Sequence, residues 1–357
     1  MSVLALARPE LLSLKPYSSA RMEAGQASVM LNANESPYAP FEGDTQQLNR
    51  YPDPQPAPLL AHLAQALGTR SEQIFVGRGS DEAIDLLVRA FCRAGEDAIL
   101  ISPPTFGMYA VAAGVQGARV LSVPLDAAAD FAPQFEAMRA AVDAEPIKLV
   151  FVCSPNNPTG GSVANSDILA LCRHCVGKAV VVVDEAYGDF SDQPSLSAAL
   201  DAHANLAILR TLSKAYGLAG ARIGVLLASA ELIALVRRIM APYPVPTPSL
   251  QAALAAFSPD AVRARAAHIQ AVLAERERLA RALEAQPGVC KVWPSAANFL
   301  AFRVDDATQV WRGLLGQGVI VRDISHYLGL SGCLRVSVGT PDENTVFLDA
   351  LRRVLGE

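Results

Sequence analysis

Short apolar runs rich in valine, leucine and isoleucine recur through the first two thirds of this chain, and helix-length segments separate them. The runs lie at residues 73–76, 98–101, 119–123, 148–152, 179–183, 206–209 and 223–228. Most are apolar on both faces, which is typical of strands in a mainly parallel sheet with helices covering both sides. The sequence therefore predicts an α/β fold built on such a sheet.

A proline-rich segment and a long helical stripe follow this region. Four of the seven residues from Pro242 to Pro248 are prolines. We expect a rigid extended loop there, because a helix cannot run through such a segment. Residues 259–286 then carry apolar side chains on one helical stripe, with Arg and Glu on the other faces. This pattern predicts a long helix that connects the first part of the fold to the last.

The C-terminal part of the chain predicts a smaller α+β unit. Strand-like runs alternate there with turn signals and helices, at residues 290–293, 299–303, 319–322 and 333–338. A length of 357 residues also exceeds what one domain usually takes up. We therefore expect a large α/β domain over residues 30–258, and a small α+β domain formed by an N-terminal arm, 1–29, together with residues 259–357.

Charge and hydropathy exclude several classes of protein. A formal net charge of -5 argues against nucleic acid as the main partner, since binding to a phosphate backbone needs a basic face. Two charge-free runs, 98–118 and 240–259, carry prolines that do not suit a membrane-spanning helix. The apolar run near the N-terminus is too short for a secretory signal. We therefore expect a cytoplasmic protein with no membrane or nucleic-acid partner.

The cysteines do not indicate a disulfide framework or a metal site. There are six in the whole chain, which is too few for a disulfide scaffold. Cys172 and Cys175 form a C-x-x-C pair around His174, but a zinc site needs a second pair, and a redox pair normally opens a helix rather than ending one. We expect buried or half-buried thiols and no metal.

The run from Thr211 to Gly224 carries the strongest chemical signal. Lys214 lies in a tight loop after an apolar strand, with Ser213 before it and Arg222 eight residues on. A lysine amine in a partly desolvated pocket near a cation has a lowered pKa, which suits a Schiff-base lysine that also carries protons. Ser213 and the planar guanidinium of Arg222 would then bind a phosphate. The alternative is that Lys214 is an ordinary solvated surface charge.

Two further strand ends carry polar groups. Asp184 follows the run 179–183, and a carboxylate there should face a cation or a ligand, such as a protonated pyridine nitrogen. Tyr187 lies three residues on and would reach a phenolic oxygen of the same ring. Asn157, in a proline-flanked turn after the run 148–152, places an amide over the same crevice. The alternatives are a helix N-cap for Asp184, a core aromatic for Tyr187 and an ordinary loop around Asn157.

The segment from Gly77 to Glu82 lies between a strand and a helix, as a dinucleotide-binding fingerprint does. It departs from that fingerprint because Glu82 occupies the last glycine position and no acidic residue ends the next strand. Gly79, Ser80 and Asp81 still form a helix N-terminus, which can hold one phosphate through backbone amides. A monophosphate cofactor fits this segment better than a pyrophosphate.

Asn157, Asp184, Tyr187 and Lys214 follow one another in this order, each at or near the end of an apolar run. In this arrangement the chain resembles the fold type I pyridoxal-phosphate aminotransferases, and the resemblance covers nearly the whole chain. It implies a pyridoxal 5'-phosphate cofactor held by Lys214, with Asp184 at the ring nitrogen and Tyr187 at the phenolic oxygen. The other cofactor-binding residues that it implies are Gly79, Ser80, Asp81, Asn157, Thr211, Ser213 and Arg222, with Tyr109 stacked on the ring.

Within that superfamily the chain resembles the histidinol-phosphate aminotransferases. The stretches that carry the resemblance are Leu14–Tyr17, Leu31–Tyr38 and Arg50–Pro54, together with the pair Arg322 and Arg335. It implies that Arg335 holds the α-carboxylate of glutamate and that Arg322 holds the histidinol phosphate group, since an arginine fork accepts either oxyanion. Without the other motifs, both arginines would be interpreted as surface salt bridges.

The same resemblance implies further substrate residues and a homodimer. Tyr17 and Tyr51 match phosphate-contacting tyrosines, and Tyr51 reaches across from the other subunit. Asn34 and Asn157 complete the expected substrate set. The chain departs from the family at Arg78, where Asn is frequent, beside the expected phosphate loop.

The implied activity is amino transfer between L-histidinol phosphate and 2-oxoglutarate, giving imidazole acetol phosphate and L-glutamate in histidine biosynthesis. Lys214 would move the proton from the substrate α-carbon. Two activities of the same fold stay open: a threonine-phosphate decarboxylase and a broad aromatic aminotransferase. A non-catalytic binding protein is a third alternative, against which the intact set of Lys214, Asp184 and Arg222 argues.

Overall fold

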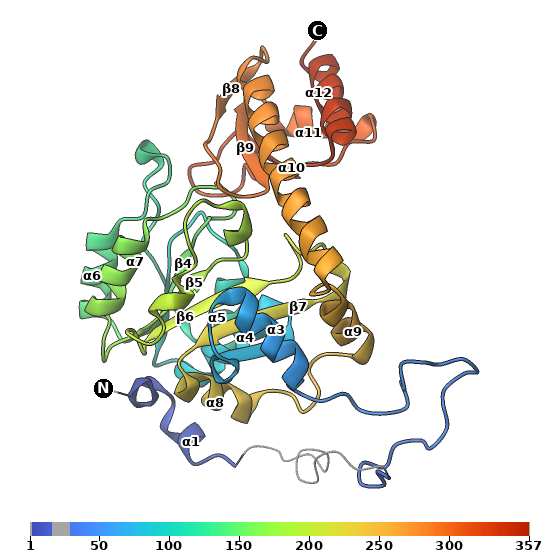
Figure 1. The fold of residues 1–357 in the computed structure, drawn as a ribbon. Coiled ribbons are helices and arrows are strands. Elements are labelled where there is room, and N and C mark those ends of the chain that lie inside the picture. The colour runs from blue at the N-terminus through green and yellow to red at the C-terminus, as the bar shows by residue number, and fades with distance from the viewer. Residues whose placement is uncertain (1, 16–28, 357) are drawn as a thin grey trace.

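The computed structural model of the protein describes residues 2–15 and 29–356. Within these residues the chain forms a large and a small sheet, and the long helix α10 (Pro259–Glu284) runs from the body around the large sheet toward the small one (Figure 1). The predicted connecting helix is therefore confirmed.

The large sheet has seven strands in the part of the chain that the structure describes, in the order β1-β7-β6-β5-β4-β2-β3. The strands are β1 (Ile74–Arg78), β2 (Ala98–Ile101), β3 (Arg119–Ser122), β4 (Ile147–Cys153), β5 (Val180–Asp184), β6 (Leu206–Thr211) and β7 (Ile223–Ala228). Neighbours from β3 to β6 are parallel, whereas β7 is antiparallel to both β6 and β1. The predicted mainly parallel sheet is confirmed.

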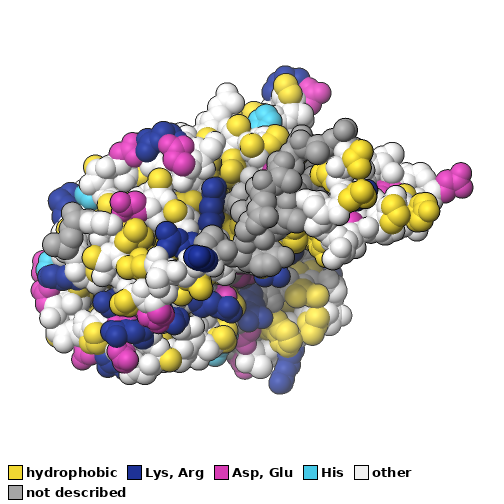
Figure 2. Space-filling model, turned by 90° about the horizontal axis from the view of Figure 1, so that it is seen from below, with side chains coloured by type: hydrophobic (Ala, Val, Ile, Leu, Met, Phe, Trp, Pro, Cys, Tyr) yellow, Lys and Arg dark blue, Asp and Glu magenta, His cyan; other side chains and the backbone are white. Residues whose placement is uncertain are grey.

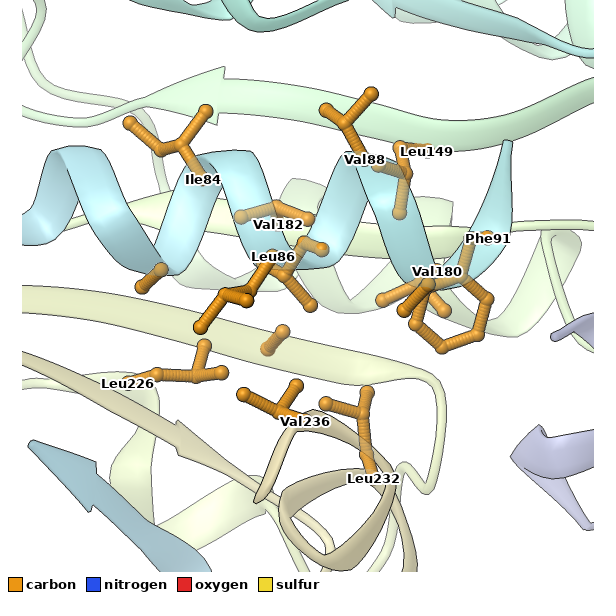
Figure 3. Packing of buried hydrophobic residues seen from close by; sticks show 14 of the residues in the cluster. Ile84, Leu86, Val88, Phe91, Leu149, Val180, Val182, Leu226, Leu232 and Val236 are labelled. Carbon is orange, nitrogen blue, oxygen red and sulfur yellow. The ribbon is translucent and has the colours of Figure 1, made fainter. Parts of the chain in front are cut away.

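Helices cover both faces of this sheet, because alternate residues of each buried strand point to opposite sides. One face packs against α4 (Ser80–Phe91), α5 (Met108–Gln116) and α8 (Ala230–Ile239), and the other against α3 (Ala57–Leu67), α6 (Phe135–Ala144), α7 (Asn165–His174) and α9 (Thr247–Ala255). Figure 3 shows the first face, where Ile84, Leu86, Val88 and Phe91 of α4 lie among Leu149, Val180, Val182, Leu226, Leu232 and Val236. The strands that carry the site residues are thus held in a dry, two-sided core.

Helix α4 begins where the strand before it ends. Gly79, with φ of 83°, makes the turn between β1 and the helix, a conformation that glycine adopts at no steric cost. Asp81 and Glu82 in the first turn and Arg89 in the last complement the helix dipole. The N-terminus of α4 therefore lies directly after the end of β1.

The small sheet is antiparallel, in the order β10-β11-β9-β8. Its strands are β8 (Val289–Val292), β9 (Phe299–Val304), β10 (Arg322–Asp323) and β11 (Cys333–Ser337), and it is accompanied by α11 (Ala307–Gly316) and α12 (Pro341–Leu355). A cluster that includes Leu283, Phe302, Leu314 and Phe347 joins these helices and α10 to the sheet. The expected strand at residues 319–322 is mostly wrong, since only Arg322 of that run lies in a strand.

Two boundaries differ from the sequence prediction. Residues Val3 and Leu6, with α1 (Pro9–Leu12) after them, pack against the helices of the large sheet, and the Arg8 N–H donates to the Ala90 carbonyl at 3.0 Å. The assignment of 1–29 to the small domain is therefore wrong for residues 2–12, because their apolar side chains fill the α4 and α8 face. The other limits of the two domains stay a prediction.

The proline segment is also shorter than expected. Helix α9 begins at Thr247, so Pro248 lies in its first turn, where the missing N–H has no helical partner to lose. The extended loop thus ends at Pro246.

Cys172 and Cys175 are both buried, as the sequence predicts. Burial raises the pKa of Cys172 to about 12 and that of Cys175 to about 11, as expected for buried thiols. Over residues 2–15 and 29–356, no group of three or more His, Cys, Asp or Glu side chains is placed to hold a metal ion. No helix among the described residues is long and apolar enough to cross a membrane.

A core substitution in α4 tests this packing. Leu87 is fully buried, so Leu87→Ala is expected to lower the free energy of unfolding by about 2–5 kcal/mol through lost contacts and a cavity. The matched control Leu315→Ala, at a position 43% exposed, should cost less than about 1 kcal/mol. Urea unfolding followed by circular dichroism measures both, and equal losses would contradict the packing described.

Candidate active site

The carboxyl ends of three neighbouring parallel strands define the site. β4, β5 and β6 end at Cys153, Asp184 and Thr211, and Cys153 is directly paired with Asp184 in the sheet register. A cavity of about 230 Å³ opens at this edge. It is lined by Gly79, Ser80, Asp81, Phe106, Cys153, Asn157, Asp184, Ala186, Tyr187, Thr211, Ser213, Lys214 and Arg222. The structure thus brings together ten of the residues that the sequence predicts for one cofactor site.

Asp184 is a buried carboxylate at the floor of this cavity, with only 3% of the residue exposed. Its Oδ2 accepts a hydrogen bond from the Tyr109 hydroxyl at 2.7 Å, and its Oδ1 accepts one from the Ala186 N–H at 3.0 Å. Burial raises the pKa of Asp184, and these two hydrogen bonds oppose that rise. The carboxylate is therefore oriented from behind while it faces the cavity.

Lys214 lines the same cavity from the turn that follows β6. Its Nζ lies 5.4 Å from the centre of the Tyr187 ring. Burial lowers the pKa of Lys214, and the positive charges of Arg335 and Arg222 lower it further. A neutral amine is consequently more accessible here than on an exposed lysine, as a nucleophile or proton carrier needs.

The cavity ends at the first turn of α4, beside Arg222. Arg222 has a left-handed backbone, with φ of 55°, and its Nη2 lies 3.2 Å from Asp81 Oδ2. Gly224 on β7 approaches the loop so closely that an added Cβ would lie 2.0 Å from the backbone of Gly79 and Ser80. This contact leaves no room for a side chain at Gly224. The backbone N–H groups at the N-terminus of α4 therefore stay uncovered and can bind a phosphate.

Asn157 connects this cavity to the small sheet. Its Nδ2 donates to the Tyr187 hydroxyl at 3.3 Å, and its Oδ1 accepts a hydrogen bond from Arg335 on β11. Burial lowers the pKa of Arg335, whose guanidinium also lies over the ring of Phe299 at 5.1 Å. One amide therefore contacts both a cavity tyrosine and the predicted substrate arginine.

Arg322 and Arg335 are neighbours across the β10 and β11 pair. They line a second hollow of about 720 Å³ on the small sheet, together with Trp311, Ile320 and Phe347. The two arginines that the sequence predicts for oxyanion binding are thus in one hollow, and Arg335 extends from it toward the cavity at Asn157.

Tyr109 is not where the sequence prediction placed it. It is fully buried, stacks on Phe151 with ring centres 4.5 Å apart, and is not among the residues that line the cavity. Phe106 lines the cavity instead, because it lies in the loop before α5, whereas Tyr109 lies in the first turn of the helix and faces the core. The prediction that Tyr109 stacks on the cofactor is therefore wrong.

Two predicted substrate residues in the described part of the chain are not joined to the cavity. Tyr17 lies outside the described residues. Asn34 is exposed on the segment between residues 29 and 56, and Tyr51 stacks on Tyr243 of the same chain with ring centres 4.4 Å apart. Neither Asn34 nor Tyr51 is among the residues lining the cavity in this single chain.

The sequence prediction also missed a buried ion-pair network behind the site. Arg210 on β6 donates to Glu185 Oε2 at 3.1 Å, and its Nη2 lies 2.8 Å from Asp189 Oδ1. Glu185 Oε1 accepts from the Leu196 N–H at 2.9 Å. The network fixes the loop that carries Tyr187. It could have been predicted from Arg210, which lies in an otherwise apolar strand, because a buried arginine needs an acidic partner.

Arg78 lies on the outer side of the phosphate loop. Its side chain pairs with Glu82 at 3.0 Å, and its backbone N–H donates to the other oxygen of that carboxylate at 2.6 Å. Arg78 and Glu82 are both absent from the lining of the cavity. Arg78 thus serves the turn into α4 rather than the cavity.

Comparison with known proteins gives one family. The family model described as aminotransferase class I and II matches residues 20–351. A histidinol-phosphate aminotransferase from Xanthomonas campestris pv. campestris is 50% identical over 354 residues, which cover 99% of this chain and 98% of the relative. One from Stenotrophomonas maltophilia is 48% identical over 350 residues, covering 98% and 96%.

Solved structures agree with these relatives. Histidinol-phosphate aminotransferase from Sinorhizobium meliloti, in complex with pyridoxal-5'-phosphate, superposes with a TM-score of 0.79 at 26% identity, over 97% of this chain and 96% of that one. L-threonine-O-3-phosphate decarboxylase from Porphyromonas gingivalis superposes with a TM-score of 0.71 at 24% identity, over 87% and 92%. The second likeness is one of fold alone.

The contact between Gly224 and the turn into α4 gives a testable prediction. In Gly224→Ala the new methyl group would force β7 and the Gly79 turn apart, so the affinity for pyridoxal phosphate should fall about tenfold or more. Gly220→Ala is the matched control, since an added Cβ there meets nothing within 4 Å. Equilibrium dialysis of both variants measures this, and equal affinities would refute the close-contact argument.

Proposed function

This chain belongs to the class I and II aminotransferase family, and we propose that it transfers the amino group between L-histidinol phosphate and 2-oxoglutarate, with imidazole acetol phosphate and L-glutamate as products. The observation that carries the proposal is the 50% identity to a histidinol-phosphate aminotransferase over 99% of the chain. The reaction is a step of histidine biosynthesis. Threonine phosphate as substrate has only the shared fold in its favour.

Pyridoxal 5'-phosphate is the cofactor, and the cavity fits it. Asp184 is a buried carboxylate suited to a protonated ring nitrogen, and Lys214 is a partly desolvated amine suited to the aldehyde. The backbone cradle at Gly79 and Gly224 suits the phosphate. When bound, pyridoxal phosphate supplies an aldehyde for the amino group and a ring that withdraws electrons from the substrate α-carbon.

Residues around the cavity have separate roles in proton transfer and in holding the cofactor. Lys214 Nζ would take the proton from the substrate α-carbon, because the lowered pKa of Lys214 keeps the amine available as a base. Tyr187 and Asn157 would hold the phenolic oxygen of the cofactor, and the hydrogen bond between them orients both side chains. Arg222 and the N-terminus of α4 hold the phosphate.

The two arginines of the small sheet hold the substrates. Arg335 reaches the cavity at Asn157, so it binds the α-carboxylate of glutamate beside the reacting carbon. Arg322 lies on the neighbouring strand and binds the phosphate of histidinol phosphate. The two amino donors carry their anionic groups at different distances from the reacting carbon, which two arginines side by side accommodate.

An amino-transfer assay tests this proposal directly. Purified protein with pyridoxal phosphate and 2-oxoglutarate should prefer L-histidinol phosphate over L-phenylalanine, which has no phosphate group for Arg322 to bind. It should also prefer it over L-threonine phosphate, the substrate class of a protein that shares only the fold, whereas the 50% identical relative is a histidinol-phosphate aminotransferase. Glutamate formation measures the rate with each donor. Lys214→Ala is the control and should abolish turnover while the protein stays folded.

Other outcomes of the same assay would change the assignment. A preference for L-phenylalanine would indicate a broad aromatic aminotransferase. Release of CO₂ from L-threonine phosphate would indicate a decarboxylase.

We also propose that the enzyme is a homodimer in which Tyr51 serves the partner's active site. The segment between residues 29 and 56 projects from the body of the chain (Figure 1). Hydrophobic side chains gather on the part that projects to the right in Figure 2, and the exposed ones are Val29, Leu31, Tyr38, Phe41, Leu48 and Tyr51. An exposed apolar surface of this kind is typical of a protein interface.

The projecting segment is internally braced, which supports this role. Glu35 pairs with Arg50 at 2.9 Å and accepts the backbone N–H of Tyr51 at 2.7 Å. The bracing fixes the backbone of Tyr51 before any partner binds. In the dimer, Tyr51 contacts the phosphate of the substrate bound by the other subunit.

Mixed dimers test the shared site. Lys214→Ala and Tyr51→Ala subunits should each be weakly active or inactive alone, yet mixing them after dissociation should restore activity. The reason is that a mixed dimer holds one site with Lys214 from one subunit and Tyr51 from the other. Glutamate formation before and after mixing measures this, and an absence of complementation would contradict the shared site.

We propose, finally, that the enzyme works in the cytoplasm. All six of its cysteines are free thiols, and five of them are buried. A reducing compartment keeps thiols in that state.

A further inference from the structure

The hydrogen bond between Tyr109 and Asp184 lies behind the wall of the cavity. The Tyr109 hydroxyl donates to Asp184 Oδ2 at 2.7 Å from outside the cavity, whereas Asp184 itself lines the cavity. The other carboxylate oxygen accepts from the Ala186 N–H. Each oxygen thus has one fixed donor within the protein, and the carboxylate cannot rotate without losing both bonds.

The tyrosine is itself immobilised. It is fully buried in the first turn of α5, with its ring stacked on Phe151 and the edge of Phe106 against it at 5.6 Å between ring centres. Tight packing of this kind allows one rotamer. The hydroxyl is therefore a fixed point to which the Asp184 carboxylate is attached.

The protonation states favour this donor and acceptor arrangement. Burial and the Asp184 charge raise the pKa of Tyr109 well above its ordinary value, so the hydroxyl keeps its proton and donates. The Tyr109 hydrogen bond works against the effect of burial on the pKa of Asp184, so it favours the ionised carboxylate. Cys153, the strand neighbour of Asp184, stays neutral because burial raises its pKa to about 12.

We propose that Tyr109 is a positioning residue that holds the Asp184 carboxylate in the orientation that faces the ring nitrogen of the cofactor. The inference rests on the proposed role of Asp184 in the cofactor site. Tyr109 does not touch the cofactor and acts only through Asp184.

The test compares pyridoxal phosphate with 1-deazapyridoxal phosphate, in which carbon replaces the ring nitrogen. Only the natural cofactor gains from a charged hydrogen bond to Asp184, so the ratio of the two dissociation constants reports that bond. Tyr109→Phe keeps the ring packing and removes the hydroxyl. It should lower the preference for the natural cofactor about tenfold, as expected for the loss of a hydrogen bond to a charged group.

Two controls separate positioning from general damage. Tyr216→Phe removes a hydroxyl from a partly buried tyrosine that does not line the cavity, and it should leave the ratio unchanged. In an Asp184→Asn background, Tyr109→Phe should have no further effect on the ratio, because both changes act on one hydrogen bond. Thermal unfolding of the cofactor-free proteins confirms that each variant is folded.

The outcomes distinguish this inference from the proposed function. A normal preference in Tyr109→Phe, with the preference lost in Asp184→Asn, overturns the role of Tyr109 and leaves that of Asp184 intact. An equal fall in Tyr216→Phe also overturns it. A wild-type protein that binds both compounds equally well overturns the role of Asp184 and the inference with it.

Discussion

A carboxylate is costly to bury, and Asp184 is buried at the end of a strand in the middle of the large sheet. The cost is offset locally by two donors, the Tyr109 hydroxyl and the Ala186 N–H. Cys153 on the adjoining strand adds no second negative charge beside Asp184, because burial raises the pKa of its thiol and keeps it neutral. The remaining capacity of the carboxylate faces the cavity, so a cationic ring completes an environment that the protein alone leaves half satisfied. In this sense the apolar core around β5 already defines the charge of the ligand.

The groups around that carboxylate are held by the sheet and by the loops that leave it. β4, β5 and β6 are adjacent and parallel, so the three loops after them must leave on the same edge. The Arg210 ion pairs then fix the loop after β5, and the bond between Asn157 and Tyr187 joins it to the loop after β4. Side chains from distant parts of the sequence are therefore positioned by rigid elements, which is a requirement for precise proton transfer.

Sequence periodicity was sufficient for the strands and for the cavity residues at their ends. Buried strands read as continuous apolar runs, and the polar residue after each run is forced to the sheet edge, as at Asp184 and Lys214. It was insufficient where two candidates lie within one turn. Phe106 and Tyr109 are both aromatic, and only the start of α5 between them decides which faces the cavity. The packing of Val3 and Leu6 on α4 and α8 was equally invisible, because contacts far apart in sequence leave no local pattern.

The bond between Arg335 and Asn157 has a consequence for the entropy of substrate capture. A free arginine side chain loses much rotational freedom when it grips a carboxylate. Arg335 has already lost it, because it rests on the Phe299 ring and on the Asn157 amide. If Arg335 holds the substrate carboxylate as proposed, the carboxylate replaces the Asn157 oxygen as the acceptor, and the arginine side chain is already in an extended conformation. On that proposal the Asn157 amide would occupy the place of the substrate carboxylate between turnovers, so each half-reaction would begin with Arg335 in the same conformation.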